Sequence, residues 1–314
     1  MGRFIARRLV ESLIVVIVVT MIVFTILHLL PGGPARALLG PRASASQVHA
    51  FMVANGYTHP VFVQYWDYIL KLLHGNLGFS YHFNQSVMAL LQQNLPKSVI
   101  LVGAATLVAL TIALPVGLLQ AQHRNKIGDH VVTTITLAGY SMPTFWLGVL
   151  LVEAFSVNLH WLPPGAPQGQ TVLSILSQPK ALILPIATLT IVTTALFSRF
   201  MRSSAIEALV QDYVRTARAE GVSPRRILWE HVFRNSVLPI ITLIGINVPG
   251  IISGALLVEV VFNYPGIGLL FWNAAGVHDY PVLMGLTVAI GIATVLGNLL
   301  ADILYAVADP RVRY

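Results

Sequence analysis

The sequence predicts an all-α membrane protein that crosses the bilayer several times. Of its 314 residues, 56% are hydrophobic and 10% are charged, and the mean hydropathy is +0.76. About a quarter of the residues of an ordinary soluble domain are charged, so this chain has too few charges to cover a globular surface. Long uncharged stretches are the second observation, because a membrane-spanning helix needs ~20 mostly apolar residues.

Six stretches have the length and composition of a transmembrane helix, and the run from Ser98 to Ala121 is the clearest because it contains no charge. The six lie at about 9–30, 98–121, 131–159, 181–198, 236–261 and 281–307. The first is too long for a secretory signal and no A-x-A-type cleavage site follows promptly, so we expect a retained helix. Pro115, Pro143 and Pro249 each interrupt a span and remove a backbone hydrogen bond.

Basic residues predict the orientation in the membrane. With a cytoplasmic N-terminus, the inner segments hold 14 of the 19 lysines and arginines, seven of them between residues 199 and 236. Short cytoplasmic segments are enriched in Lys and Arg, so both termini and the 199–236 loop are expected to face the cytoplasm. This bias explains the net charge of +7, and we expect no nucleic acid as a partner.

The spans divide the chain into three parts. Residues 1–30 form the cytoplasmic N-terminus and the first transmembrane helix. Residues 31–97 form an extracytoplasmic loop with short helices, because the segment "VFVQYWDYILKLLHGNLGFS" mixes aromatic and apolar residues as interfacial helices do. Residues 98–314 form a core transmembrane domain of five helices, and its cytoplasmic loop lies at 199–236.

The chain lacks the motifs of nucleotide hydrolysis and of metal catalysis. It has no cysteine, which excludes disulfides, thiolate metal sites and cysteine nucleophiles. It contains neither a G-x-x-x-x-G-K-[ST] P-loop nor an H-E-x-x-H motif. Gly250 and Gly254 are four residues apart in a span, a spacing typical of close helix packing. We therefore expect no catalytic residue, no cofactor and no metal in this chain.

Acidic residues within the spans give little support to an ion-coupled transporter. Glu11 and Glu259 lie near predicted span ends, where we expect them to reach water. Glu153 lies towards the outer end of the third span, and Asp302 lies near the cytoplasmic end of the last. No span carries a row of acids suited to a proton relay. Capping or structural pairing is our main interpretation of these carboxylates.

Charge is concentrated in residues 212–239, "DYVRTARAEGVSPRRILWEHVFRNSVLP". The segment "IEALVQDYVRTARAEG" is helical in composition, and Gly221 ends it. A second helix is predicted to begin with Ser223 as N-cap and Pro224 at its first position. A charged helical hairpin on a membrane protein suits docking to a partner. A solvated loop without a special function is the alternative that composition leaves open.

The motif "RTARAEG" followed by "LP" resembles the EAA loop of ABC importer permeases. The spacing of 17 positions from Gly221 to Leu238 is similar to the longer loop of dipeptide, oligopeptide and nickel permeases. Further segments resemble this family in order: "MGRFIARRLVESLIVVIVVTMIVFTILHLLPGGPA", "GNLGFSY" (75–81), "SMPTFWLGVLL" (141–151), "VEVVFNYPGIGLL" (258–270), "HDYPVLMG" (278–285) and "NLLADILYAVADPRVRY" (298–314). Lys97-Ser98 is a departure, since the family often has a threonine before the second helix.

Over almost its whole length the chain resembles the B-type transmembrane subunit of dipeptide/oligopeptide ABC importers, in the binding-protein-dependent transport inner-membrane component family. This resemblance implies the type I permease fold and a multi-pass location in the bacterial cytoplasmic membrane. The chain would be a transporter subunit and no enzyme, because ATP and Mg would be bound by separate cytoplasmic ATPases. The implied partners are a homologous second permease, two ABC ATPase subunits or domains, an extracytoplasmic peptide-binding protein and the lipid membrane.

The resemblance also implies which residues couple the permease to its ATPases. They are Arg215, Thr216, Ala217, Arg218, Ala219, Glu220, Gly221, Val222, Ser223, Pro224 and Arg225. Among them we favour Ala217, Gly221 and Arg225. A permease for nickel or another small solute is one alternative, and a stand-alone secondary transporter or a membrane scaffold are others. The spans hold no cluster of His or Cys, which favours peptides over nickel.

Overall fold

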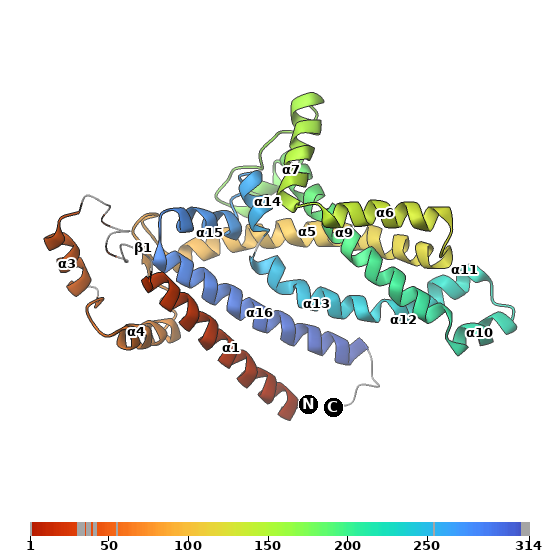
Figure 1. Cartoon of the computed structure of the whole chain (residues 1–314), viewed down its shortest axis with the longest axis horizontal. Helices are drawn as coiled ribbons and strands as arrows, with labels where there is room; N and C mark the ends of the chain where they lie inside the picture. The colour runs from red at the N-terminus through yellow and green to blue at the C-terminus, as the bar shows by residue number, and fades with distance from the viewer. Residues whose placement is uncertain are drawn as a thin grey trace.

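The computed structural model describes residues 2–29, 35, 39, 43–54, 56–253 and 255–308. Five long helices form the body of the molecule (Figure 1). They are α1 (Gly2–Leu29), α5 (Val87–Gln122), α9 (Pro179–Leu209), α13 (Leu238–Ser253) and α16 (Tyr280–Ala308). The Pro-Gly-x-Pro segment at 31–34, Gly254 and the last residues of the C-terminal motif, 309–314, lie outside the described residues.

Two predicted spans belong to longer helices. α5 begins at Val87, well before the predicted start at residue 98, and Ser86 caps it by accepting a hydrogen bond from Ala89 N at 3.2 Å. α9 begins at Pro179 and continues to Leu209, so the predicted start of the loop at residue 199 falls inside a helix. The residues after 198 are mostly helix formers, and no glycine or proline stops them.

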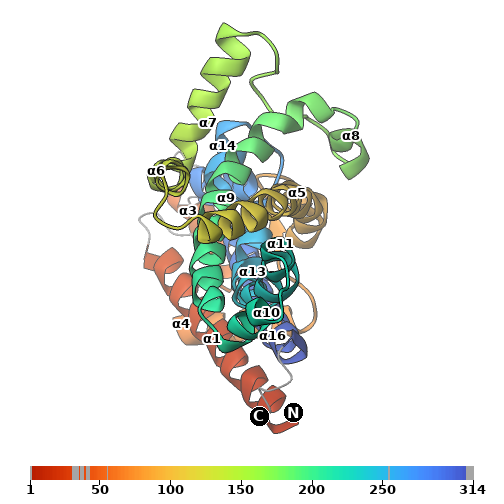
Figure 2. The ribbon, with the colours of Figure 1, turned by 90° about the vertical axis from the view of Figure 1, so that its right-hand side faces the viewer.

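The third predicted span, 131–159, is two helical segments joined at a sharp bend. α6 (Ile127–Ser141) ends before Pro143, and α7 (Thr144–Val152) continues into the π-helical turn η1 (Glu153–Asn158). The two segments meet at 101°. Proline disfavours helical geometry at the residue before it, and Met142 is extended, which confirms the predicted interruption at Pro143. Figures 1 and 2 show α7 extending away from the other helices.

The all-α polytopic class is confirmed. Within the described residues, four helices are long and apolar enough to cross a membrane, or five if the bent pair forms one span. They are Val87–Gln122, Pro179–Leu209, Pro224–Gly245 and Tyr280–Leu299. The number of six spans stays a prediction. Large apolar side chains that face outward, such as Leu107 at 67% exposure, suit lipid contact.

Short elements cover one end of the helix bundle. They are α3 (Ala45–Ala54), α4 (Val61–Leu73) and an antiparallel pair of strands, β1 (Phe79–Ser80) and β2 (Gln85–Ser86). Three further short helices, α8 (Val172–Leu176), α14 (Leu256–Val261) and α15 (Ile267–Gly276), complete the connections between the long ones. α3, α4 and β1 lie at the opposite end of the molecule from α10 and α11, which belong to the charged hairpin (Figure 1).

Two long helices, α5 and α9, approach each other closely at Gly117 of α5. A Cβ at this position would lie 2.5 Å from the carbonyl oxygen of Ser198 and 2.7 Å from Cβ of Met201, both on α9. No side chain larger than hydrogen fits this contact. Small residues allow membrane helices to pack backbone against backbone, so Gly117 fixes the spacing of α5 and α9.

Candidate coupling site

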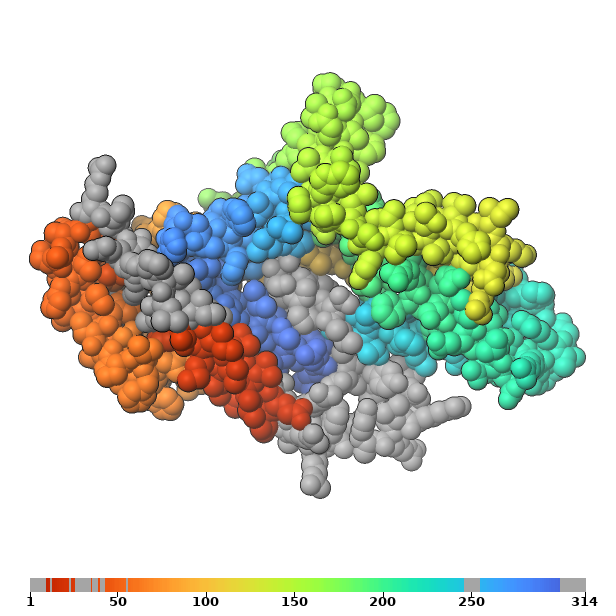
Figure 3. Space-filling model, in the orientation of Figure 1, coloured from red at the N-terminus to blue at the C-terminus, as the bar shows by residue number. Residues whose placement is uncertain are grey.

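The charged segment folds as a helical hairpin at one end of the molecule (Figures 1 and 3). Its first helix is α10 (Asp212–Ala219), and its second arm consists of α11 (Pro224–Arg226), η2 (Ile227–Val232) and α12 (Phe233–Ser236). We refer to residues 212–236 as the coupling hairpin. The prediction of one helix from Ile206 to Gly221 is wrong, because Gln211 is extended (φ −71°, ψ 154°) and separates α9 from α10. Asp212 in the first turn of α10 favours a new helix start there.

Gly221 forms the tip of the coupling hairpin in a left-handed conformation, with φ +78°. Its N–H donates to Arg218 O at 3.1 Å, and Val222 N donates to Ala217 O at 3.0 Å. This pair of bonds is the Schellman motif, which favours glycine at the residue after the cap. Residues with a side chain rarely adopt a positive φ, so the turn depends on Gly221.

The second arm begins as predicted, at Ser223 and Pro224. Ser223 has the extended backbone of an N-cap, and its carbonyl accepts from Ile227 N at 3.0 Å. Its hydroxyl makes no capping hydrogen bond. Pro224 occupies the first helical position, where its missing N–H costs nothing. Gly221 and Pro224 therefore reverse the direction of the chain within four residues.

An apolar seam holds the two arms together. Val214 and Ala217 of α10 are 0% and 5% exposed, and they belong to one core cluster with Ile227, Leu228 and Val232. Ala217 therefore packs inside the coupling hairpin and does not face a partner. Of the other predicted coupling residues, Val222 is half-buried and the remaining nine are exposed.

The arginines of the coupling hairpin divide into two groups. Arg215 pairs with Asp212 at 3.4 Å and Arg226 with Glu230 at 2.7 Å, both on the exposed surface. The other three arginines of residues 212–236, all of which the structure describes, form no ion pair: Arg218, Arg225 and Arg234. Their charges are available to an acidic surface. Arg225 borders an open hollow of about 430 Å³ together with Ser223, Arg226, Trp229 and Glu230.

Tyr213 connects the first arm to the end of the second. Burial raises the pKa of its hydroxyl above the ordinary value, and a hydrogen bond with Asn235 opposes that rise. The hydroxyl therefore stays neutral at physiological pH.

A buried ion pair ties α9, on which the coupling hairpin rests, to the start of α6. Arg202 Nε and Nη2 donate to the two carboxylate oxygens of Asp129, each at 2.7 Å. Asn125 N donates to the same carboxylate at 3.0 Å. Asp129 is 2% exposed and the Arg202 side chain is 27% exposed, so the pair is largely shielded from solvent. The two hydrogen bonds between Arg202 and Asp129 thus link α9, at the base of the hairpin, to α6.

Comparison with known proteins places this arrangement in a family. Residues 113–314 match the family described as "Binding-protein-dependent transport system inner membrane component", and residues 1–102 match the corresponding N-terminal family. The chain belongs to this permease family. The prediction from the sequence motifs is confirmed, and the permease is a multi-pass membrane protein that works with partner subunits.

Relatives match the permease from end to end. It is 36% identical over 316 residues to the oligopeptide transport system permease protein AppB of Bacillus subtilis, covering 100% of both chains. It is 37% identical over 331 residues to the di/tripeptide transport system permease protein DppB of Pseudomonas aeruginosa, covering 99% of this chain and 98% of the relative. It is 34% identical over 315 residues to the glutathione transport system permease protein GsiC of Salmonella typhimurium, covering 100% of both.

The motif "VEVVFNYPGIGLL" forms a buried polar network with the start of the predicted second span. Glu259 is 0% exposed, so the expectation that it reaches water is wrong. Its carboxylate accepts from Ser98 Oγ at 2.6 Å, from Gly268 N at 2.6 Å and from Leu269 N at 3.1 Å. Ser98 Oγ in turn accepts from Ile267 N at 2.8 Å. The first amides of α15 are therefore capped by side chains from α14 and α5.

Sequence reasoning missed this network and noted Lys97-Ser98 only as a departure from the family pattern. The signal in the sequence is an acid inside an apolar run, followed by two glycines. A Cβ on Gly266 would lie 2.4 Å from Ser98 Oγ, and one on Gly268 would lie 2.5 Å from Cα of Leu256. Both glycines are needed because the backbone of α15 passes directly over Glu259.

The motifs "GNLGFSY" and "HDYPVLMG" pack against each other at the end of the molecule opposite the coupling hairpin. Ser80 Oγ donates a hydrogen bond to the buried carboxylate of Asp279, and Asp279 accepts a second bond from Val282 N at 3.3 Å. A Cβ on Gly78, where φ is +97°, would lie 3.4 Å from Cβ of Pro281. These contacts fix the strand pair onto the start of α16.

Proposed function

We propose that this permease forms, with a homologous second permease, the translocation path of an ATP-driven importer for short peptides in the bacterial cytoplasmic membrane. The support for a peptide substrate is the set of full-length relatives that are named for oligopeptides, di- and tripeptides, and glutathione. Nickel is the alternative substrate, and the test below includes it.

The coupling hairpin carries the proposed link to ATP hydrolysis. Two cytoplasmic ATPases bind ATP and Mg, and the tip of the hairpin, with Arg215 to Arg225, fits into a groove of one of them. Gly221 sets the turn, and the unpaired Arg218 and Arg225 meet acidic residues of that ATPase. Electrostatic complementarity of this kind directs the encounter and the register more than the affinity.

Movement of the coupling hairpin reaches the membrane helices through α9. The apolar seam makes the hairpin one body, and α9 is held to α5 at Gly117 and to α6 by Asp129. Closure of the ATPases therefore displaces α5, α6 and α9 together, as in a rigid-body switch. The proposed topology has six spans with both termini in the cytoplasm, and a peptide-binding protein delivers substrate to the opposite end.

Co-purification tests the assembly. The tagged permease is solubilised from native membranes in mild detergent and every co-purifying chain is identified. ATPases, a second permease and an extracytoplasmic binding protein are the expected result. Vesicles containing the recovered complex are then assayed for ATP-driven uptake of a labelled dipeptide and of nickel. Uptake by the permease alone would overturn the importer, and uptake of nickel without peptide would overturn the substrate.

Gly221 variants test the coupling assignment. Gly221→Val places a β-branched side chain at φ +78°, which costs ~1–2 kcal/mol of conformational strain. We expect ATP-driven uptake to fall while the protein still inserts into the membrane. Gly221→Asn should retain most uptake, because asparagine tolerates this conformation. Gly128→Val is the matched control, since no atom of the described chain lies within 4 Å of its added Cβ. Normal uptake by Gly221→Val would refute the assignment.

A further inference from the structure

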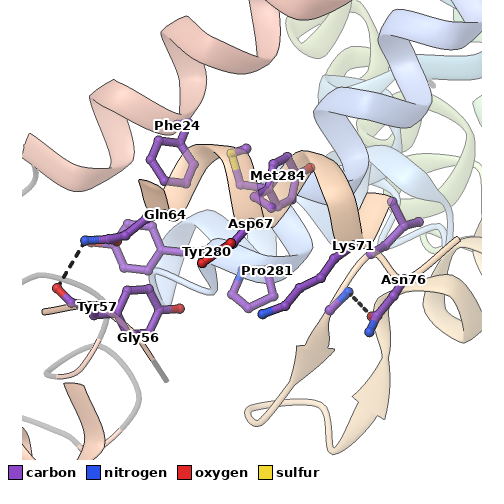
Figure 4. A pocket seen from close by; sticks show the side chains of 13 residues that line it. Phe24, Gly56, Tyr57, Gln64, Asp67, Lys71, Asn76, Tyr280, Pro281 and Met284 are labelled. Atoms are coloured by element: carbon purple, nitrogen blue, oxygen red, sulfur yellow. Dashed lines mark hydrogen bonds between the residues drawn. The ribbon is translucent and has the colours of Figure 1, made fainter. Parts of the chain in front are cut away.

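A pocket of about 180 Å³ lies at the end of the molecule opposite the coupling hairpin. Its walls come from three separate parts of the chain: α1, the segment from residue 56 to 78, and the start of α16 (Figure 4). Phe24, Tyr57, Tyr280 and Met284 supply much of the apolar lining. Sites for drug-sized ligands are usually ~300–1,000 Å³, so this pocket suits a smaller group.

Two opposite charges line the pocket without neutralising each other. Asp67 and Lys71 are four residues apart on α4, a spacing that places both on one face of the helix. Neither side chain forms an ion pair or hydrogen bond with any part of the chain that the structure describes. Figure 4 shows both extending towards the same opening, with Pro281 between their charged ends. The pocket therefore presents a carboxylate and an ammonium to one ligand.

The remaining polar groups of the pocket fix its shape. Asn76 Oδ1 accepts from Gly78 N at 2.9 Å, and Gln64 Nε2 donates to Tyr57 O at 3.1 Å (Figure 4). These bonds hold both sides of the pocket in place. One residue of the pocket has an unsatisfied polar atom, because Tyr68 Oη is buried and has no hydrogen-bond partner among the described residues. Buried polar atoms usually have partners, so this hydroxyl is an exception.

An apolar stripe lies beside the charged pair on α4. Phe62, Trp66, Leu70 and Leu73 are 75%, 60%, 40% and 76% exposed, at helical spacing. Trp66 and Leu70 directly precede Asp67 and Lys71 in sequence. Such an exposed stripe is typical of a helix that lies at a membrane surface. The pocket is thus next to a surface suited to lipid chains.

We propose that this pocket binds a compact zwitterion, with its primary ammonium against Asp67 and its acidic group against Lys71. The aromatic rings of Tyr57 and Tyr280 favour the cationic end. A phosphatidylethanolamine headgroup and a free amino acid or dipeptide share this chemistry. The bound group joins α1, α4 and α16, and it stabilises their packing. The test of this site requires no transport.

Two arms of one experiment distinguish the sources. In the first, glycylglycine is titrated into full-length permease in phosphatidylglycerol nanodiscs, with calorimetric detection. In the second, permease is extracted from nanodiscs containing equal phosphatidylethanolamine, phosphatidylcholine and phosphatidylglycerol, and retained lipids are counted by native mass spectrometry. Heat in the first arm identifies a free zwitterion. Preferential retention of phosphatidylethanolamine identifies a headgroup.

Three variants connect either signal to the pocket. Asp67→Asn and Lys71→Gln should each weaken binding about tenfold, because each removes one charged hydrogen-bonding partner. Lys126→Gln, an exposed lysine before α6, should leave binding unchanged. Binding in neither arm would overturn the proposal. Equal retention of phosphatidylcholine counts as no specific binding in the second arm, because its methylated ammonium cannot donate a hydrogen bond to Asp67. Binding that survives both pocket substitutions would also overturn the proposal.

Discussion

The guanidinium of Arg202 and the carboxylate of Asp129 form parallel hydrogen bonds, Nε to Oδ1 and Nη2 to Oδ2, each 2.7 Å long. Removing one partner of a shielded pair leaves an uncompensated charge, which typically costs ~3–5 kcal/mol. Asp129→Asn is therefore expected to lower the Tm of the purified permease by roughly 5–10 °C in a fluorescence melt. Asp212→Asn is the control, because the ion pair that it breaks, with Arg215, is exposed and should shift Tm little. Equal shifts in both variants would contradict the structural role of the Asp129 pair.

Gly117 is expected to tolerate no side chain. Gly117→Ala places a methyl group 2.5 Å from the carbonyl of Ser198, so α5 and α9 must move apart. Overpacking of this kind costs ~1–3 kcal/mol. Gly103→Ala in the same helix meets nothing within 4 Å and should stabilise the protein by up to ~1 kcal/mol. Thermal melts of the two variants should therefore shift in opposite directions, and an unchanged or higher Tm for Gly117→Ala would argue against the close helix contact.

Ser98 is expected to matter more than its size suggests. Ser98→Ala removes one donor to Glu259 and leaves Ile267 N without its acceptor, at a cost of ~1–3 kcal/mol. Hydrogen exchange should show faster exchange of the first amides of α15. Ser236→Ala is a matched control, because that serine is also 0% exposed but its hydroxyl has no partner among the described residues. Unchanged exchange in Ser98→Ala would show that the network does not hold α15.

Arg218 and Arg225 are expected to steer the ATPase. Reversing both charges, Arg218→Glu with Arg225→Glu, should slow association of the permease with purified ATPases at low salt. The difference from the unmodified protein should shrink as salt increases, because exposed charges are screened over ~10 Å at 0.1 M. Surface-immobilised permease gives the association rates. Arg124→Glu, which reverses an exposed charge outside the coupling hairpin, is the control, and an equal effect there would mean general charge attraction.

Local patterns predicted much of this protein, because the relevant signals lie close together in sequence. The turn at Gly221, the helix start at Pro224 and the break at Pro143 each depend on backbone preferences of one or two residues. The break at Gln211 was missed because no glycine or proline marks it. The chain is extended at Gln211, and α10 begins at the next residue, Asp212.

The other features that the sequence did not predict depend on long-range contacts or on where helices end. Ser98 and Glu259 are 161 positions apart, and neither lies in a pattern that identifies the other as its partner. The ends of helices α5 and α9 also exceeded the predicted spans, since hydropathy measures apolar length while hydrogen bonding and propensity decide where a helix stops. Of the favoured coupling residues, Ala217 is buried in the apolar seam. This burial was not predicted, because the residues that cover Ala217 lie on the other arm of the hairpin.

The bend at Pro143 has a geometric consequence for the membrane. Two segments that meet at 101° cannot both stand along the bilayer normal, so at least one of them is steeply tilted. A steeply tilted arm that carries Phe145 and Trp146 on its surface occupies more bilayer area than an upright helix of equal length. A bent pair therefore needs more room in a bilayer than one straight span, and any neighbouring subunit has to fit around the projecting α7 (Figure 2).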